Sequence, residues 1–152
     1  MDVLRQLQDS AFSMWVLGSD SIWSYPTVLT LHTVGLAILV GAAMVVDLRV
    51  LGIGAGVPLR NIAGMYRYIW IGFLINLASG VILFAVQAAD RAVQPVFYVK
   101  LAFIVVAFGL ALGLRRHLAA GDAGSQAARN MAVGSLACWV AAIVTGRLMA
   151  YV

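Results

Sequence analysis

Two side chains that ionise in water lie within apolar stretches of this 152-residue sequence. Lys100, the only lysine, follows Pro95 by five residues in one apolar run, and His32, one of two histidines, lies in another. An ionisable side chain is costly in the hydrocarbon layer, so in membrane proteins it marks a functional site and is paired or bound to a ligand. We therefore look for the function of the chain at these two residues.

The composition is that of an integral membrane protein. Hydrophobic residues make up 63% of the chain and charged residues only 11%, whereas a soluble domain has about 25% charged residues. One span needs about 20 apolar residues, so the length allows four spans, short connections and a single domain, residues 1–152. The net charge of +4 comes from arginines clustered in loops, as topology signals are, and does not indicate nucleic-acid binding.

The hydrophobic pattern predicts an all-α membrane protein, an antiparallel bundle of four transmembrane helices preceded by an amphipathic helix in the membrane surface. We expect the surface helix within residues 1–20, where apolar and polar residues recur at helical spacing. In this division Asp47 closes the first span, and no aspartate lies within any span. The four spans are expected at about 24–46, 66–86, 95–114 and 131–151.

Small residues predict how the helices pack, and basic residues predict how the bundle is oriented in the membrane. Glycines, Cys138 and Ala142 recur at every fourth position of the third and fourth spans, which predicts close helix packing and self-association. The loops after the first and third spans hold more arginines than the opposite ends, which carry Arg5 and Arg91. By the positive-inside rule both termini face outward, which is the periplasmic side of a bacterial inner (plasma) membrane. The arginines that set this orientation are Arg49, Arg60, Arg67, Arg115, Arg116 and Arg129.

This topology brings three polar side chains into the same half of the membrane. At a rise of 1.5 Å per residue, His32 lies about 12 Å, Lys100 about 7 Å and Arg147 about 6 Å below the outer boundary. His117 is expected at the inner end of the third span, so it cannot share a ligand with His32 within one protomer.

Histidine in a helical bundle is the commonest protein ligand of haem iron. Haem is apolar across its ring and anionic at its propionates, so Lys100 and Arg147 would supply cationic partners near the outer boundary. Gly35, one turn after His32, would let the flat macrocycle approach the backbone. We therefore expect a haem b site in which His32 is the axial ligand and Lys100 is either the second ligand or a propionate partner.

Each of these residues also has a purely structural explanation. His32 could hydrogen-bond to a helix carbonyl or to Asn76, Lys100 could extend its amine to the headgroup region, and Arg147 could be an interface arginine. The alternative function is then a cofactor-free accessory subunit or scaffold of a larger membrane complex.

A copper or small-solute transporter is the second alternative. Met14 and Met149 could supply thioether ligands for Cu(I). Zinc would need three or four His, Cys or carboxylate ligands, and His32 alone is available at this depth. A transporter of protons or ions would normally use a buried carboxylate.

Two segments resemble a known family. The stretches His32-Thr-Val-Gly35-Leu-Ala37 and Phe97-Tyr98-Val99-Lys100-Leu101 are similar to the first and third spans of the HemJ-type membrane haem proteins. These are protoporphyrinogen oxidases, with relatives among copper-resistance and uncharacterised bacterial membrane proteins. Residues 23–49 resemble one such uncharacterised family more closely. The resemblance implies b-type haem, with His32 matching the family's first-helix histidine and Lys100 its third-helix lysine.

The expected function is therefore electron transfer near the outer face of the membrane. An apolar groove between helices would suit a quinone or a porphyrin as the substrate. A second His32 from a neighbouring protomer could complete bis-histidine ligation of the iron. We expect the protein to lie in the lipid bilayer as a homo-oligomer or as a subunit of a membrane complex.

Overall fold

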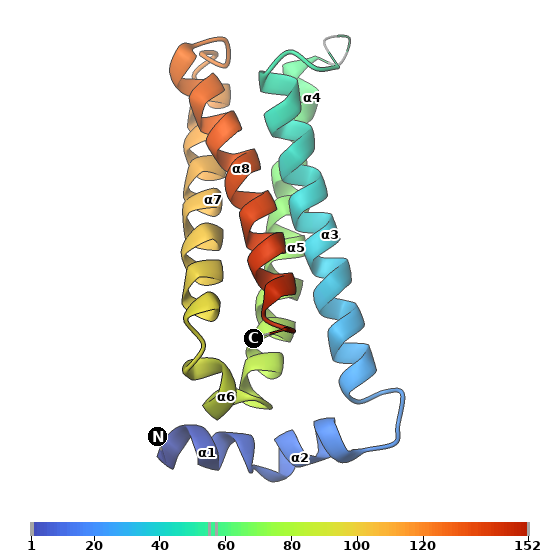
Figure 1. Cartoon of the computed structure of the whole chain (residues 1–152). Helices are drawn as coiled ribbons and strands as arrows, with labels where there is room; N and C mark the ends of the chain where they lie inside the picture. Colours follow the sequence, from blue (N-terminus) through green and yellow to red (C-terminus); the bar gives the residue numbers. More distant parts are fainter. Residues whose placement is uncertain (1, 55, 57, 152) are drawn as a thin grey trace.

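The computed structural model describes residues 2–54, 56 and 58–151. Its long elements are helices, and four of those described are long and apolar enough to cross a membrane. Figure 1 shows these four side by side in a bundle. The predicted fold class is confirmed, and the chain is a multi-pass membrane protein. Met1 and Val152, the limits of the predicted domain, lie outside the described residues.

Three of the four spans begin where the sequence supplies helix-start signals. Pro26 and Pro95 each lie in a first turn, where the missing N–H costs no hydrogen bond. Ser125 caps the last span by accepting a hydrogen bond from the backbone N–H of Ala128. The spans are α3 (Tyr25–Val50), α5 (Met65–Ala85), α7 (Pro95–Ala119) and α8 (Gln126–Leu148).

Helix α3 continues to Val50 rather than ending near residue 46, and this changes the position of Asp47. Asp47 lies within the helix and is only 1% exposed. The expectation that no aspartate lies within a span is therefore wrong. The physical reason is that Tyr66 of α5 and Ser135 of α8 lie beside Asp47, so these two helices cover this end of α3 and bury the carboxyl group.

The N-terminal segment forms two helices, α1 (Asp2–Gln8) and α2 (Ala11–Gly18), rather than one. The break occurs because the Ser10 hydroxyl accepts a hydrogen bond from the Ser13 N–H and so starts a new helix. Gln8 joins this segment to the short helix α6 (Ala88–Ala92), since its side chain donates to Asp90 and accepts from the Ala89 N–H.

Helices α1, α2 and α6 lie across one end of the bundle, and both described chain ends lie there too (Figure 1). We call this the α6 end. The opposite end, which carries the short helix α4 (Leu59–Ile62), is called the α4 end. Met14 and Trp15 of α2 are exposed, and Ser13 and Val16 are buried.

The bundle is built from two close helix pairs, α3 with α5 and α7 with α8. The closest approach is in the first pair, because a Cβ atom on Gly72 would lie 2.8 Å from the Gly35 carbonyl oxygen and nearer still to the Leu39 backbone. The predicted small-residue contacts are only partly present. Gly134 lies against Leu110, whereas a Cβ on Gly109 would meet no atom within 4 Å.

Candidate functional site

A cavity of about 600 Å³ lies between the spans, toward the α6 end. Its lining comes from α3, α5, α6, α7 and α8 and is mostly apolar. Cavities of roughly 300–1,000 Å³ with apolar walls and a few placed polar groups are typical of small-molecule and cofactor sites. The polar side chains among the lining residues are Tyr25, His32, Asn76, Gln87, Arg91, Lys100, Trp139 and Arg147.

Helix α5 fixes the imidazole of His32 in the cavity wall. The Nδ1 of His32 lies 3.0 Å from the Ser79 Oγ. The ring packs against Gly80, where an added Cβ would lie 3.2 Å from the His32 Cε1. The Ser79 hydroxyl donates its own proton to the Ile75 carbonyl, at 2.7 Å. The oxygen of Ser79 can therefore accept the Nδ1 proton of His32, which assigns the Nδ1–H tautomer.

This tautomer leaves a lone pair on the Nε2 of His32. Within the described part of the chain, that nitrogen has no hydrogen-bond partner. Asn76 donates from its side-chain amide to the His32 carbonyl, at 2.9 Å, and so ties the same residue to α5 a second time. A histidine whose Nδ1–H is held by a neighbour and whose Nε2 is open has the orientation of a metal-ligating histidine.

Lys100 extends into the cavity alongside α8. A Cβ on Gly146 would lie 3.4 Å from the Lys100 Cε and 3.5 Å from its Nζ, so the missing side chain at Gly146 makes room for the lysine. The Lys100 amine is close enough to His32 and Arg91 to interact electrostatically with both. No carboxylate is among the lining residues that the structure describes, so no lining carboxylate offsets the positive charge of a protonated Lys100 amine.

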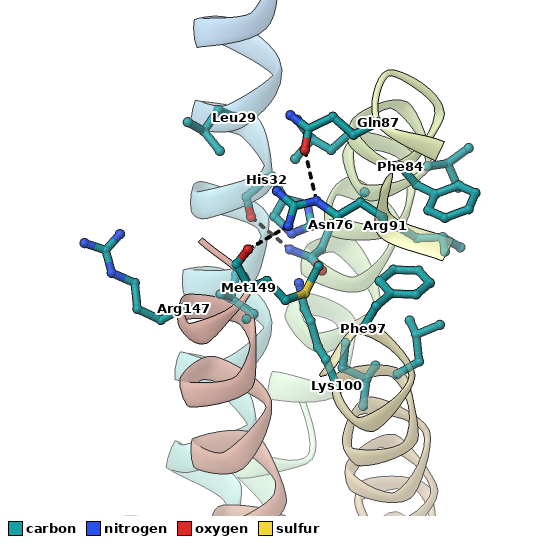
Figure 2. Close-up of a pocket in the computed structure, with 18 of the residues that line it drawn as sticks. Leu29, His32, Asn76, Phe84, Gln87, Arg91, Phe97, Lys100, Arg147 and Met149 are labelled. Carbon is teal, nitrogen blue, oxygen red and sulfur yellow. Dashed lines mark hydrogen bonds between the residues drawn. The ribbon is translucent and has the colours of Figure 1, made fainter. Parts of the chain in front are cut away.

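Arg91 is another cation at the cavity, and it was not among the predicted site residues. Its Nε donates to the Gln87 Oε1 at 2.9 Å, and its Nη1 donates to the Gln94 Oε1 at 2.9 Å and to the Met149 carbonyl at 2.7 Å. These bonds join α6 to the end of α8 (Figure 2). The available signal was the pair of glutamines four residues before and three residues after the arginine.

Two predicted site residues are not placed as expected, although Arg147 is among the lining residues. Arg147 is exposed, its Cζ lies 5.8 Å from the centre of the Tyr151 ring, and Figure 2 shows its side chain pointing away from His32 and Lys100. Gly35 is not a lining residue. A Cβ there would lie 2.8 Å from the Asn76 backbone nitrogen, so α5 fills the space that we expected a macrocycle to occupy.

The other candidate ligands are dispersed. His117 lies toward the α4 end and pairs with Asp122, with 3.1 Å between Nδ1 and Oδ2. Met149 lines the cavity, whereas Met14 is 63% exposed on α2. The described residues contain no group of three or more His, Cys, Asp or Glu side chains that could hold a metal ion. A lone imidazole suits a metal that brings its other ligands with it.

Comparisons with known proteins bear on the family and not on the activity. No curated protein and no solved structure matches the chain significantly. A family model, described as a family of unknown function, matches residues 18–152. The matched range includes all four spans and every residue that lines the cavity. The chain therefore belongs to the family of unknown function DUF6644.

Proposed function

We propose that this protein binds haem b in the cavity and takes part in electron transfer, with His32 as the axial ligand of the iron. The observation that carries this proposal is the hydrogen bonding of the two ring nitrogens of His32. Its Nδ1 is held by the Ser79 hydroxyl at 3.0 Å, while its Nε2 is left without a hydrogen-bond partner in the described structure. An imidazole that is held through Nδ1 and leaves Nε2 open to the cavity is oriented to bind a metal there.

The residues around the cavity fit the chemistry of haem. Apolar walls suit the ring, and the stacked pair Phe84 and Phe97, with centroids 5.2 Å apart, forms part of them. The two carboxylates of haem need cations, which Lys100 and Arg91 supply at a cavity that has no described carboxylate of its own. We assign Arg91 the role first expected of Arg147, because the Arg147 guanidinium points away. The alternative role of Lys100 is to bind the iron as the second ligand, and the visible spectrum distinguishes the two roles.

When bound, haem supplies reversible one-electron chemistry, and the protein holds it, orients it and limits its access to water. We propose that the α4 end is the inner end, because six arginines lie in the two loops there, counting those at the adjoining span ends. The cavity then lies near the outer face of a bacterial inner membrane, with both termini in the periplasm. A quinone or a porphyrin is the class of substrate that fits, and self-association remains part of the proposal.

The test is the visible spectrum of the detergent-solubilised protein, first oxidised and then reduced with dithionite. We expect a Soret band in the wild type that His32→Ala abolishes. His117→Ala is the matched control, because it removes the other imidazole from the far end of the bundle, and it should leave the band in place. A colourless wild type, or an unaltered spectrum in His32→Ala, would contradict the proposal.

The two alternative functions give different results in the same preparation. A cofactor-free subunit or scaffold gives colourless protein that co-purifies with partner proteins. A copper transporter gives copper without haem, and its copper content falls when Met149 or Met14 is replaced.

A further inference from the structure

A second group of buried polar side chains lies beyond the cavity, toward the α4 end. Asp47 is 1% exposed, and Ser135 and Trp139 are fully buried. In the described part of the chain, Asp47 Oδ2, Ser135 Oγ and Trp139 Nε1 are the buried side-chain polar atoms without a hydrogen-bond partner. Roughly 90% or more of buried polar groups in proteins are hydrogen-bonded, so these three need a physical explanation.

The three residues form a column across the interface of α3 and α8. Ser135 and Trp139 are one turn apart on the same face of α8, about 6 Å along its axis. The Asp47 carboxyl group faces Ser135, and Trp139 lines the cavity. The column therefore begins at Asp47, near the end of α3, and reaches the cavity that contains His32.

The groups around Asp47 do not neutralise a carboxylate. Tyr66 on α5 is close enough to interact electrostatically, but its hydroxyl donates to the Ala111 carbonyl, at 3.0 Å. On α7, Arg115 lies with its Cζ 5.6 Å from the centre of the Tyr66 ring, and it makes no ion pair with Asp47 in the described structure. Ser135 on α8 is uncharged. Such surroundings favour the neutral form of a buried carboxyl group, and water molecules can bridge buried polar atoms of this kind.

We propose that Asp47, Ser135 and Trp139 form an internal proton site, in which the Asp47 carboxyl group carries a proton and exchanges it with the cavity through bridging water. The Asp47 O–H passes its proton to water beside the Ser135 hydroxyl, and the return of a proton restores the acid. Only O–H bonds form and break, and no electron moves. The Trp139 N–H, which can only donate, orients the water nearest the cavity. The inference is independent of whether the cavity binds haem.

Infrared spectroscopy of the full-length protein in lipid tests this directly. We expect the carbonyl stretching band of a protonated carboxylic acid at neutral pH, shifted when H₂O is replaced by D₂O. Asp47→Asn, which keeps the size of the side chain, should remove the band. Asp90→Asn, the same change at an exposed aspartate of α6, should leave it. Absence of the band from the wild type, or its persistence in Asp47→Asn, would overturn the proposal.

A second measurement tests the path and does not depend on the folding of Asp47→Asn. Ser135→Val replaces the hydroxyl with an apolar group that leaves less space for water. The Asp47 band should remain, but its exchange into D₂O should slow by roughly tenfold or more, because one hydrogen-bonded step of the relay is lost. Val133→Ser, a change on an exposed face of α8, is the control and should leave the exchange rate unaltered. Equal exchange rates in Ser135→Val and wild type would overturn the column as the path.

Discussion

Replacing Gly72 by alanine should force α3 and α5 apart. The added Cβ would lie 2.8 Å from the Gly35 carbonyl oxygen and closer still to the backbone of Leu39, whereas ordinary contact begins at 3.4 Å. These are backbone atoms, so no change of rotamer can relieve the overlap. The two helices must therefore separate by about 0.6 Å or more at this point.

The size of the effect follows from two opposing contributions. Overpacking a well-packed core costs about 1–3 kcal/mol, and we expect the upper end because the clash is with backbone. Alanine is better than glycine in a helix by about 0.5–1 kcal/mol, so the net loss for Gly72→Ala is about 2 kcal/mol. Gly41→Ala is the matched control. It lies on α3, its added Cβ would meet no atom within 4 Å, and it should stabilise the protein by about 0.5–1 kcal/mol.

Reversible unfolding in mixed micelles of increasing sodium dodecyl sulfate, followed by circular dichroism, measures both free energies of unfolding. The free energy of unfolding should fall in Gly72→Ala and rise in Gly41→Ala. A Gly72→Ala variant as stable as the wild type would show that α3 and α5 do not approach as closely as their glycines indicate.

Two further predictions concern the cavity. Ser79→Ala should weaken haem binding by roughly 10–100-fold, because it removes the group that orients His32; titration of the haem-free protein with haem measures this, and an unchanged affinity would contradict it. Arg91→Gln should lower the free energy of unfolding by about 1.5–3 kcal/mol, the contribution of a hydrogen bond from a charged group such as the one to Met149, and should also weaken haem binding. Arg147→Gln is its control, and equal effects of the two arginine variants would refute the assignment.

The four spans are predictable because long apolar runs leave a membrane chain few other structures. The end of α3 was not predictable, because the charge of Asp47 after an apolar run indicated that the span ends there. Its burial depends on α5 and α8 packing over it, and that contact is absent from the sequence of any single helix. The break between α1 and α2 depends likewise on one hydrogen bond of Ser10.

The candidate site was likewise predictable only in part. The depth of a residue in the membrane follows from the helical rise per residue. His32 and Lys100 were expected in the same half of the membrane, and they line one cavity. Depth does not fix which way a side chain faces around the helix, so Arg147 lies at a suitable depth but points away. Arg91 reaches the cavity from α6, a helix too short for the hydrophobic pattern to predict. Gly35 lies close to His32 in the chain, but α5 covers it.

The central claim is that the open Nε2 of His32 binds the iron of a haem in this cavity. An experimental density map of the purified, haem-replete protein in lipid tests it most directly. We predict flat density the size of a porphyrin joined to the His32 imidazole, with Lys100 and Arg91 at its anionic edge. A map in which the cavity holds a lipid chain, or in which side chains close it around an unbound imidazole, would contradict the account.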